Sequence, residues 1–176
     1  MEGMVLGITA DSTIGFVGIA AAIGLIYVAI RYKQSMVSKR RDALKAFAKE
    51  NGLELSLKGE DGAYGEFLGI SFRTTQESAY GDYRGRKIRV GYFQDYRIKR
   101  YVNTYFYAAV NSPRPGPLPK AAQEKARRFN ERYGFKKVAL EKGDVRAVKE
   151  AYALDAKELR GIADGLVEIA EAVDKY

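Results

Sequence analysis

The sequence predicts an α+β fold, in which a single N-terminal transmembrane helix leads into an antiparallel β-meander of about four or five strands flanked by helices. Three observations predict this fold. Residues 12–30 carry no charge, and residues 159–173 repeat apolar side chains at helical spacing. Between them, stretches of residues 53–110 either alternate apolar and polar side chains or are rich in aromatic and β-branched residues, as strands are.

The uncharged stretch between Asp11 and Arg31 has the length of a membrane span. A helix of these 19 residues would be about 28 Å long, close to the hydrocarbon thickness of a bilayer. A cleaved signal peptide would need basic residues ahead of the stretch, whereas the only charges there are Glu2 and Asp11. A buried core helix is the other alternative. We interpret residues 12–30 as a membrane anchor.

The distribution of charge predicts the orientation of this anchor. No lysine or arginine precedes Arg31, and several follow it closely, so the positive-inside rule places the C-terminal side in the cytoplasm. The predicted protein is therefore a single-pass protein of the cell membrane with its N-terminus outside. Its expected parts are a short extracytoplasmic N-terminus (1–11), a transmembrane helix (12–30), a basic juxtamembrane segment (31–41) and a cytoplasmic α+β domain (42–176).

Small residues in the anchor favour close contact between two helices. Gly18 and Ala22 have the small-xxx-small spacing that allows helices to approach each other in lipid. This spacing makes a homodimer possible through Gly18 and Ala22. The alternative is that small residues are simply common in membrane helices.

Regular elements are expected throughout the rest of the chain. Residues 37–51 have helical apolar spacing, and Leu53, Leu55 and Leu57 alternate like a half-buried strand before a turn at 59–62. Further strands are expected at 67–72, 77–83, 86–95 and 101–110, with a hairpin turn at Arg84-Gly85. Four prolines within 113–119 predict an extended connector.

The C-terminal third is predicted to be mostly helical. Helices are expected at 119–133, where Gly134 ends the helix, and at 144–153, with a strand at 135–140 between them. Asp155 and Glu158 form a capping pair before the last helix. The apolar stripe of that helix consists of Leu159, Ile162, Leu166, Ile169 and Val173.

The composition removes most catalytic chemistry. The chain has no cysteine and no histidine, which excludes thiolate metal sites, cysteine nucleophiles and the usual general base near neutral pH. No phosphate-binding glycine loop of the P-loop or dinucleotide type is present. We therefore predict no catalytic residue, no cofactor and no metal site, and an enzyme of unknown type is only the last alternative.

A surplus of positive charge predicts an anionic partner. All 30 lysines and arginines follow residue 30 with 20 of the 22 acids, which leaves this part of the chain at +10. Anionic lipid, an acidic protein and nucleic acid are the partner classes that fit. The expected contacts with the anionic membrane surface are Arg31, Lys33, Lys39, Arg40 and Arg41.

A second basic group is interleaved with tyrosines. Seven of the 13 tyrosines lie between Tyr80 and Tyr107. The basic residues among them form a candidate face for an anionic partner: Arg84, Arg86, Lys87, Arg89, Arg97, Lys99 and Arg100. Aromatic rings with basic neighbours on a sheet can hold single-stranded nucleic acid, and that function requires Tyr83, Tyr92 and Tyr105 to be exposed. The alternative is that one face of each strand packs and the other meets solvent.

One stretch resembles a known group of sequences. GEFLGISF (65–72) and AYGDYRGRKIRVGYFQDY (79–96) resemble a family of uncharacterised prokaryotic membrane-associated proteins, as does RFNERYGF (128–135). The matching residues are Gly81, Tyr83, Gly85, Arg86, Phe93, Asp95 and Tyr96, while Gln94 departs from the pattern. The resemblance covers about residues 40–175. It implies the outline of the fold and assigns no activity.

The function that these observations favour is a membrane-tethered, non-catalytic binding or scaffold module with an anionic partner on the cytoplasmic side. A nucleic-acid-binding domain that uses the Tyr/Arg-rich sheet is the alternative from another class.

Overall fold

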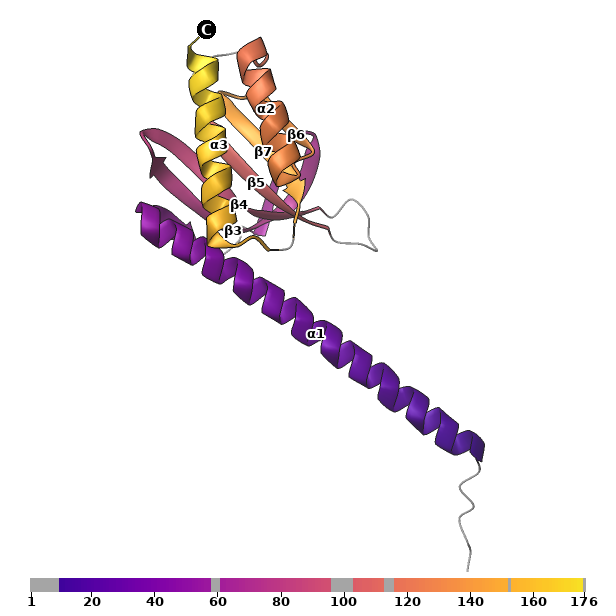
Figure 1. Ribbon diagram of the computed structural model, residues 1–176. Helices are drawn as coiled ribbons and strands as arrows, with labels where there is room; N and C mark the ends of the chain where they lie inside the picture. Colours follow the sequence, from indigo (N-terminus) through magenta and orange to yellow (C-terminus); the bar gives the residue numbers. More distant parts are fainter. Residues whose placement is uncertain (1–9, 58–60, 96–102, 113–115, 152, 176) are drawn as a thin grey trace, which may run out of the picture. The chain divides into compact units, whose positions relative to one another are not determined.

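The computed structural model describes residues 10–57, 61–95, 103–112, 116–151 and 153–175, with side chains described except at 10–17, 61–66, 71–75, 95 and 103. The elements in chain order are α1 (Ala10–Asn51), β1 (Glu54–Ser56), β2 (Asp61–Phe67), β3 (Ile70–Tyr83), β4 (Arg86–Asp95), β5 (Asn103–Asn111), α2 (Lys120–Tyr133), β6 (Lys137–Glu141), β7 (Asp144–Glu150) and α3 (Ala156–Asp174) (Figure 1). The chain divides into two compact units, Met1–Val37 and Ser38–Tyr176.

The second unit is built on one antiparallel sheet. Its described strands follow the order β1-β3-β4-β5-β7-β6, and β2 pairs with β3 as well. Helices α2 and α3 lie over one face of this sheet (Figure 1). The architecture is thus α+β with an antiparallel sheet, in agreement with that part of the sequence prediction.

Two-residue turns set the hairpins. The β2–β3, β3–β4 and β6–β7 connections each consist of one residue and a glycine with positive φ angles, at Leu68-Gly69, Arg84-Gly85 and Lys142-Gly143. Two consecutive positive φ angles match the right-handed twist of the strands that they join. The turn at Arg84-Gly85 confirms the predicted hairpin.

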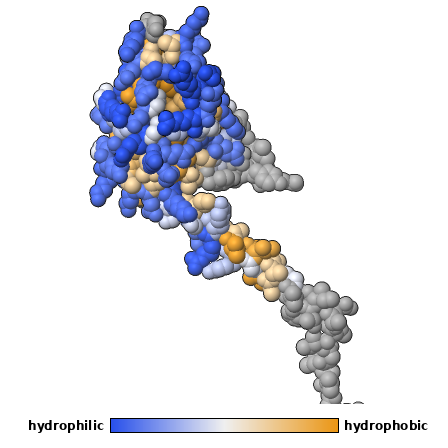
Figure 2. All heavy atoms as spheres, in the orientation of Figure 1, coloured by the Kyte–Doolittle hydropathy of each residue, from blue (hydrophilic) through white to orange (hydrophobic). Residues whose placement is uncertain are grey.

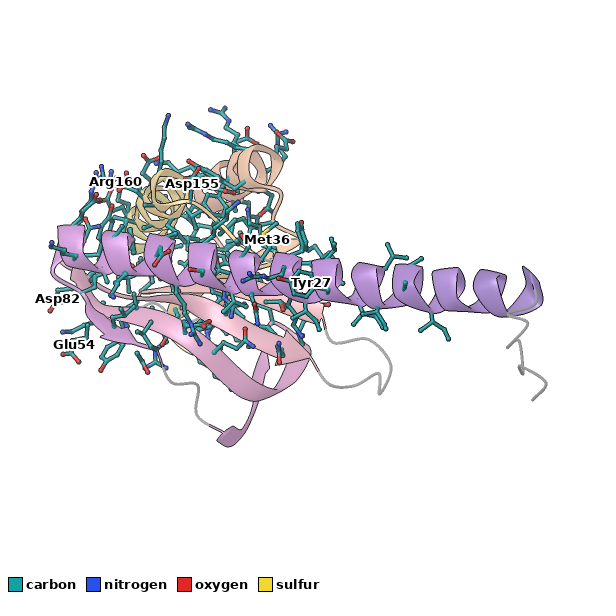
Figure 3. All side chains as sticks on the ribbon, turned by 90° about the horizontal axis from the view of Figure 1, so that it is seen from below. Tyr27, Met36, Glu54, Asp82, Asp155 and Arg160 are labelled. Atoms are coloured by element: carbon teal, nitrogen blue, oxygen red, sulfur yellow. The ribbon has the colours of Figure 1, made fainter. Side chains whose placement is uncertain are left out.

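The two faces of the sheet bury different clusters. On the helix-covered face, Val90, Phe106 and Val145 belong to a large core with α3 and the end of α1. On the other face, called here the outer face, residues of β4, β5 and β7 form a smaller cluster with the end of β2 and its turn. Its buried members are Phe67, Leu68, Phe93, Tyr105, Tyr107 and Val148. Figure 3 labels Asp155 and Arg160 on the helix side, and Glu54 and Asp82 on the sheet side.

Helices α2 and α3 pack through a glycine notch. A Cβ atom at Gly165 would lie 2.6 Å from the ring of Phe129, and one at Gly161 would lie 2.5 Å from the hydroxyl of Tyr133. Both helices lie at the predicted positions. Asp155 caps α3 by accepting a hydrogen bond from the Glu158 backbone N–H at 2.7 Å, which confirms the predicted capping pair.

The membrane prediction has to be corrected. No helix in the described residues combines the length and the apolar character needed to cross a membrane. Within the described residues, the prediction of a transmembrane helix at 12–30 is therefore wrong. The localisation at the cell membrane stays a prediction. The exposed apolar side chains of α1 include Leu25. The apolar part of this helix appears orange in Figure 2.

Two local predictions are also wrong. Residues 144–150 form strand β7 and not a helix, because Val145 and Ala147 enter the core while Arg146 points to the outer face, an alternation of period two. The expected strand at 67–72 is broken by the turn at Leu68-Gly69. Seven strands in the described residues therefore replace the four or five expected.

The carboxylate of Asp174 binds the C-terminal end of α3 to the sheet and the segment after β5. The Ser112 hydroxyl donates to Asp174 Oδ1 at 2.7 Å, and Arg86 Nη2 donates to Asp174 Oδ2 at 2.5 Å. Burial by itself would raise the pKa of Asp174, but the two hydrogen bonds and the charge of Arg86 outweigh it and lower the pKa.

We expect Asp174→Asn to reduce the free energy of unfolding at pH 7 by about 1 kcal/mol. Because the folded state lowers the pKa, the carboxylate contributes above the ordinary Asp value of about 3.9, and the contribution is lost as the pH falls through the lowered value. Urea unfolding followed by tyrosine fluorescence at pH 7, 5 and 3 measures the effect. The gap between the two proteins should shrink toward pH 3, whereas Glu171→Gln, which changes an exposed acid of α3, should show little gap at any pH.

Candidate functional site

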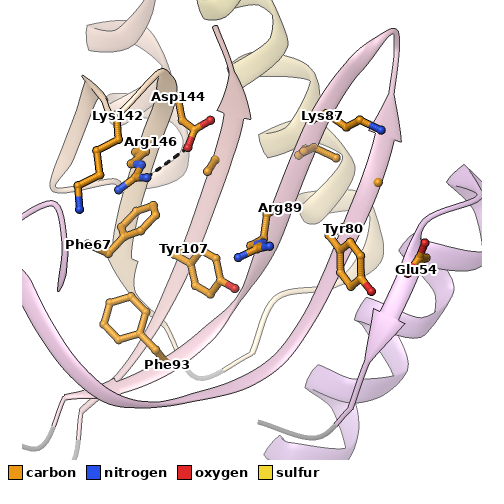
Figure 4. A pocket seen from close by; sticks show the side chains of 13 residues that line it. Glu54, Phe67, Tyr80, Lys87, Arg89, Phe93, Tyr107, Lys142, Asp144 and Arg146 are labelled. Carbon is orange, nitrogen blue, oxygen red and sulfur yellow. Dashed lines mark hydrogen bonds and ion pairs between the residues drawn. The ribbon is translucent and has the colours of Figure 1, made fainter. Parts of the chain in front are cut away.

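A groove on the outer face of the sheet has the size of a small-molecule site. Its volume is about 680 Å³, within the range of pockets that take small ligands. Charged side chains and aromatic rings both line it, and Phe67, Phe93 and Tyr107 lie together on one side (Figure 4). The charged residues are Glu54, Lys87, Arg89, Lys142, Asp144 and Arg146, and the aromatic ones are Phe67, Tyr80, Phe93 and Tyr107.

Strand register explains why these residues meet. Arg89 on β4 lies opposite Tyr80 on β3 and Ala109 on β5, and Ala109 lies opposite Arg146 on β7. Glu54 on β1 extends the row beyond Tyr80. Residues in one cross-strand row point to the same face. Two arginines thus stand on either side of a small alanine, on strands far apart in the sequence.

Arg89 is the exposed cation at the centre of the groove. Its guanidinium lies 6.0 Å from the centroid of the Tyr80 ring, and it makes no ion pair with any described residue. In Figure 4 it lies between Tyr107 and Tyr80. A hydrogen bond and the negative charge of Glu54 raise the pKa of Tyr80.

Arg146 is by contrast held by the protein. Its Nη1 lies 3.1 Å from Glu141 Oε2 and its Nη2 lies 3.2 Å from Asp144 Oδ2. Its guanidinium also stacks at 5.1 Å from the centroid of the Phe67 ring. These contacts neutralise Arg146 and make it a fixed wall of the groove.

Two lysines complete the positive rim. Lys87 pairs with Asp82 at 2.8 Å, but both side chains are well exposed and such a pair is weak. Lys142 occupies the β6–β7 turn and is exposed without an ion pair to a described residue. Its side chain runs beside Arg146 in Figure 4. The groove therefore offers Arg89 and Lys142 to a ligand.

No related protein defines this site. No family model, curated protein or solved structure matches the chain. The resemblance to a family of uncharacterised membrane-associated proteins therefore stays a prediction, and the site rests on its own geometry.

The candidate face from the sequence is only partly brought together. Lys87 and Arg89 line the groove. Arg84 pairs with Asp164 at 3.1 Å and Arg86 pairs with Asp174, both toward α3. Arg97, Lys99 and Arg100 lie outside the described residues. The sequence prediction missed Lys142 and Arg146 because residues 144–153 were expected to be helical. Gly143 was the available signal, since glycine favours the positive φ angle that the turn requires.

The tyrosines predicted to bind nucleic acid are buried. Tyr83, Tyr92 and Tyr105 are each at most 9% exposed, so the prediction that their rings form an open stacking surface is wrong. Burial, followed by the hydrogen bond donated to Asp164 at 2.6 Å, raises the pKa of Tyr83 to about 12. Tyr92 accepts a hydrogen bond from the Leu154 backbone N–H at 3.2 Å inside the core.

The basic residues at 31–41 are placed differently from one another. Arg40 is only 5% exposed, with Nη2 at 2.7 Å from Glu77 Oε2 and its guanidinium over the Tyr92 ring, so its charge is not presented at the surface. Arg41 also binds Glu77, at 2.6 Å. Arg31 donates to the Tyr27 hydroxyl at 3.0 Å, and Lys33 and Lys39 are exposed. Their contact with an anionic membrane surface stays a prediction.

Proposed function

We propose that residues 38–176 form a binding module that takes a small anionic ligand into the groove on the outer face of the sheet. The observation that carries the proposal is Arg89, an exposed guanidinium at the centre of the groove without an ion pair to any described residue. A carboxylate, sulfonate or phosphate group could pair with this guanidinium through charge-assisted hydrogen bonds.

The surroundings of Arg89 favour an anion over a cation or a neutral ligand. Among the lining residues the four cations outnumber the two acids, Glu54 and Asp144. Asp144 is already bound to Arg146, and Glu54 is engaged with Tyr80. The net charge of +8 on the whole chain acts in the same direction at long range.

The aromatic rings favour a small ligand over a nucleic-acid strand. Among the aromatic rings that line the groove, Tyr80 is 38% exposed, whereas Phe67, Phe93 and Tyr107 are buried. Binding a strand by stacking needs several exposed rings in succession. The groove offers one such ring and a volume suited to one small molecule.

A fluorescence titration with two matched dyes tests the proposal. Anilinonaphthalene sulfonate carries a ring system and one anionic group, and phenylnaphthylamine has the same rings without the charge. We expect Arg89→Gln to weaken binding of the sulfonate dye by about tenfold or more, since a hydrogen bond to a charged group contributes about 1.5 kcal/mol or more. Binding of the neutral dye should change little.

Arg132→Gln is the matched control. Arg132 is also exposed, also lies over a tyrosine ring (that of Tyr133, at 5.3 Å from the centroid), and is on α2 outside the groove. It removes the same charge from the same protein. If both substitutions weaken binding of the sulfonate dye equally, the cause is the net charge of the protein, and the proposed site is wrong.

A further inference from the structure

One side of the groove is apolar, and this indicates the chemistry of the part of the ligand that carries no charge. Phe67, Phe93 and Tyr107 line the groove and also belong to the small cluster on the outer face. The ring centroids of Phe67 and Tyr107 lie 5.3 Å apart, and those of Phe67 and Phe93 lie 6.4 Å apart. An anion bound at Arg89 therefore has an apolar wall beside it, on the side of Tyr107 and Phe67 (Figure 4).

The part of the groove between Arg89 and Arg146 is a narrow slot. Ala109 is the residue of β5 between Arg89 and Arg146 in the cross-strand row, and it is partly open to the groove. The two arginine backbones are two strand spacings apart, roughly 10 Å. With long side chains on both sides and a single methyl group between them, the slot has about the width of one hydrocarbon chain.

We propose that the ligand is an amphiphilic anion, whose anionic group binds Arg89 and whose hydrocarbon chain lies over Ala109 toward Tyr107 and Phe67. This inference rests on the proposed function and adds the chemistry of the ligand's uncharged part. The fixed position of Arg146, held by Glu141 and Asp144, keeps the far wall of the slot in place. Its stack on Phe67 joins that wall to the apolar cluster.

A series of straight-chain carboxylates tests this by calorimetry on the full chain. Acetate, hexanoate, octanoate and decanoate keep the anionic group constant and lengthen only the chain. Full burial of each methylene would raise the affinity about fourfold, or about 200-fold from hexanoate to decanoate. Because the slot is open on one side, we expect a rise of at least about tenfold over that range.

Leucine substitutions at two alanines of the same cross-strand row show where the ligand's hydrocarbon chain binds. Ala109→Leu fills the slot and should remove most of the rise in affinity with the length of the acyl chain. Ala139→Leu is the control, since Ala139 lies opposite Arg146 on its other side, on β6, and does not line the groove. Unfolding curves of both variants show whether either is destabilised.

The outcomes separate the two proposals. If the affinity for the carboxylates depends on Arg89 but not on the length of their hydrocarbon chain, the inference of an amphiphilic ligand is wrong. The proposed anion site is then still supported. If Ala109→Leu and Ala139→Leu alter the dependence on chain length equally, the ligand's hydrocarbon chain binds outside the slot, and this inference is also wrong. Loss of the Arg89 dependence in the dye titration overturns the proposed function itself.

Discussion

Glu77→Leu is expected to destabilise the domain by about 3–5 kcal/mol, because it leaves the buried Arg40 without its carboxylate. Glu77 is 2% exposed and Arg40 is 5% exposed. Their ion pair at 2.7 Å joins the helix α1 to strand β3. A charge that is taken out of water and then loses its partner costs far more than an exposed pair contributes.

The second substitution in this experiment is Arg40→Met, alone and combined with Glu77→Leu. The double variant should recover a large part of the loss, because two apolar side chains replace two buried charges. Urea unfolding measures all four proteins, followed by tyrosine fluorescence because the chain has no tryptophan. Glu124→Gln, at an exposed acid of α2, is the control and should change the free energy of unfolding by less than about 1 kcal/mol. A double variant no more stable than Glu77→Leu would contradict this account.

Gly91→Ala is expected to destabilise the domain by about 1–3 kcal/mol through overpacking. A Cβ atom at Gly91 would lie 2.8 Å from the Glu77 carbonyl oxygen and 3.0 Å from the Ser78 Cα. These are backbone atoms of the neighbouring strand β3, at an irregularity in its pairing with β4 between Thr75 and Ser78. A backbone held in a sheet cannot move aside as a flexible side chain can.

Gly24→Ala is the matched control for this substitution. A Cβ atom at Gly24 meets no atom within 4 Å, and the residue lies inside helix α1, where alanine is the better helix former. The same unfolding measurement should therefore show no loss for Gly24→Ala. An equal loss in both variants would mean that the contact with Glu77 and Ser78 is not the cause.

Much of the fold follows from short sequence signals. The Arg84-Gly85 turn, the Asp155/Glu158 capping pair, the end of α2 at Gly134 and the apolar stripe of α3 all lie where the pattern predicts. Each of these signals acts between residues a few positions apart. Local geometry therefore decides them almost independently of the rest of the chain.

The errors lie where distant residues override local preference. Residues 144–150 are rich in good helix formers, yet pairing with β5 and β6 makes them a strand. Arg40 reads as a member of a basic surface segment, yet it is buried against Glu77, 37 positions later. The described residues likewise contain no helix fit to cross a membrane, although the apolar character of 12–30 suggested one.

The sequence by itself determined the α+β class, the turn at Arg84-Gly85 and the exclusion of cysteine and histidine chemistry, because composition and short-range patterns contain that information. It also indicated a surplus of positive charge. Only the tertiary structure decided which cations are free and which are neutralised. Arg89 and Arg146 are 57 positions apart and share a groove because β5 lies between their strands, and a register of this kind depends on the pairing of the whole sheet.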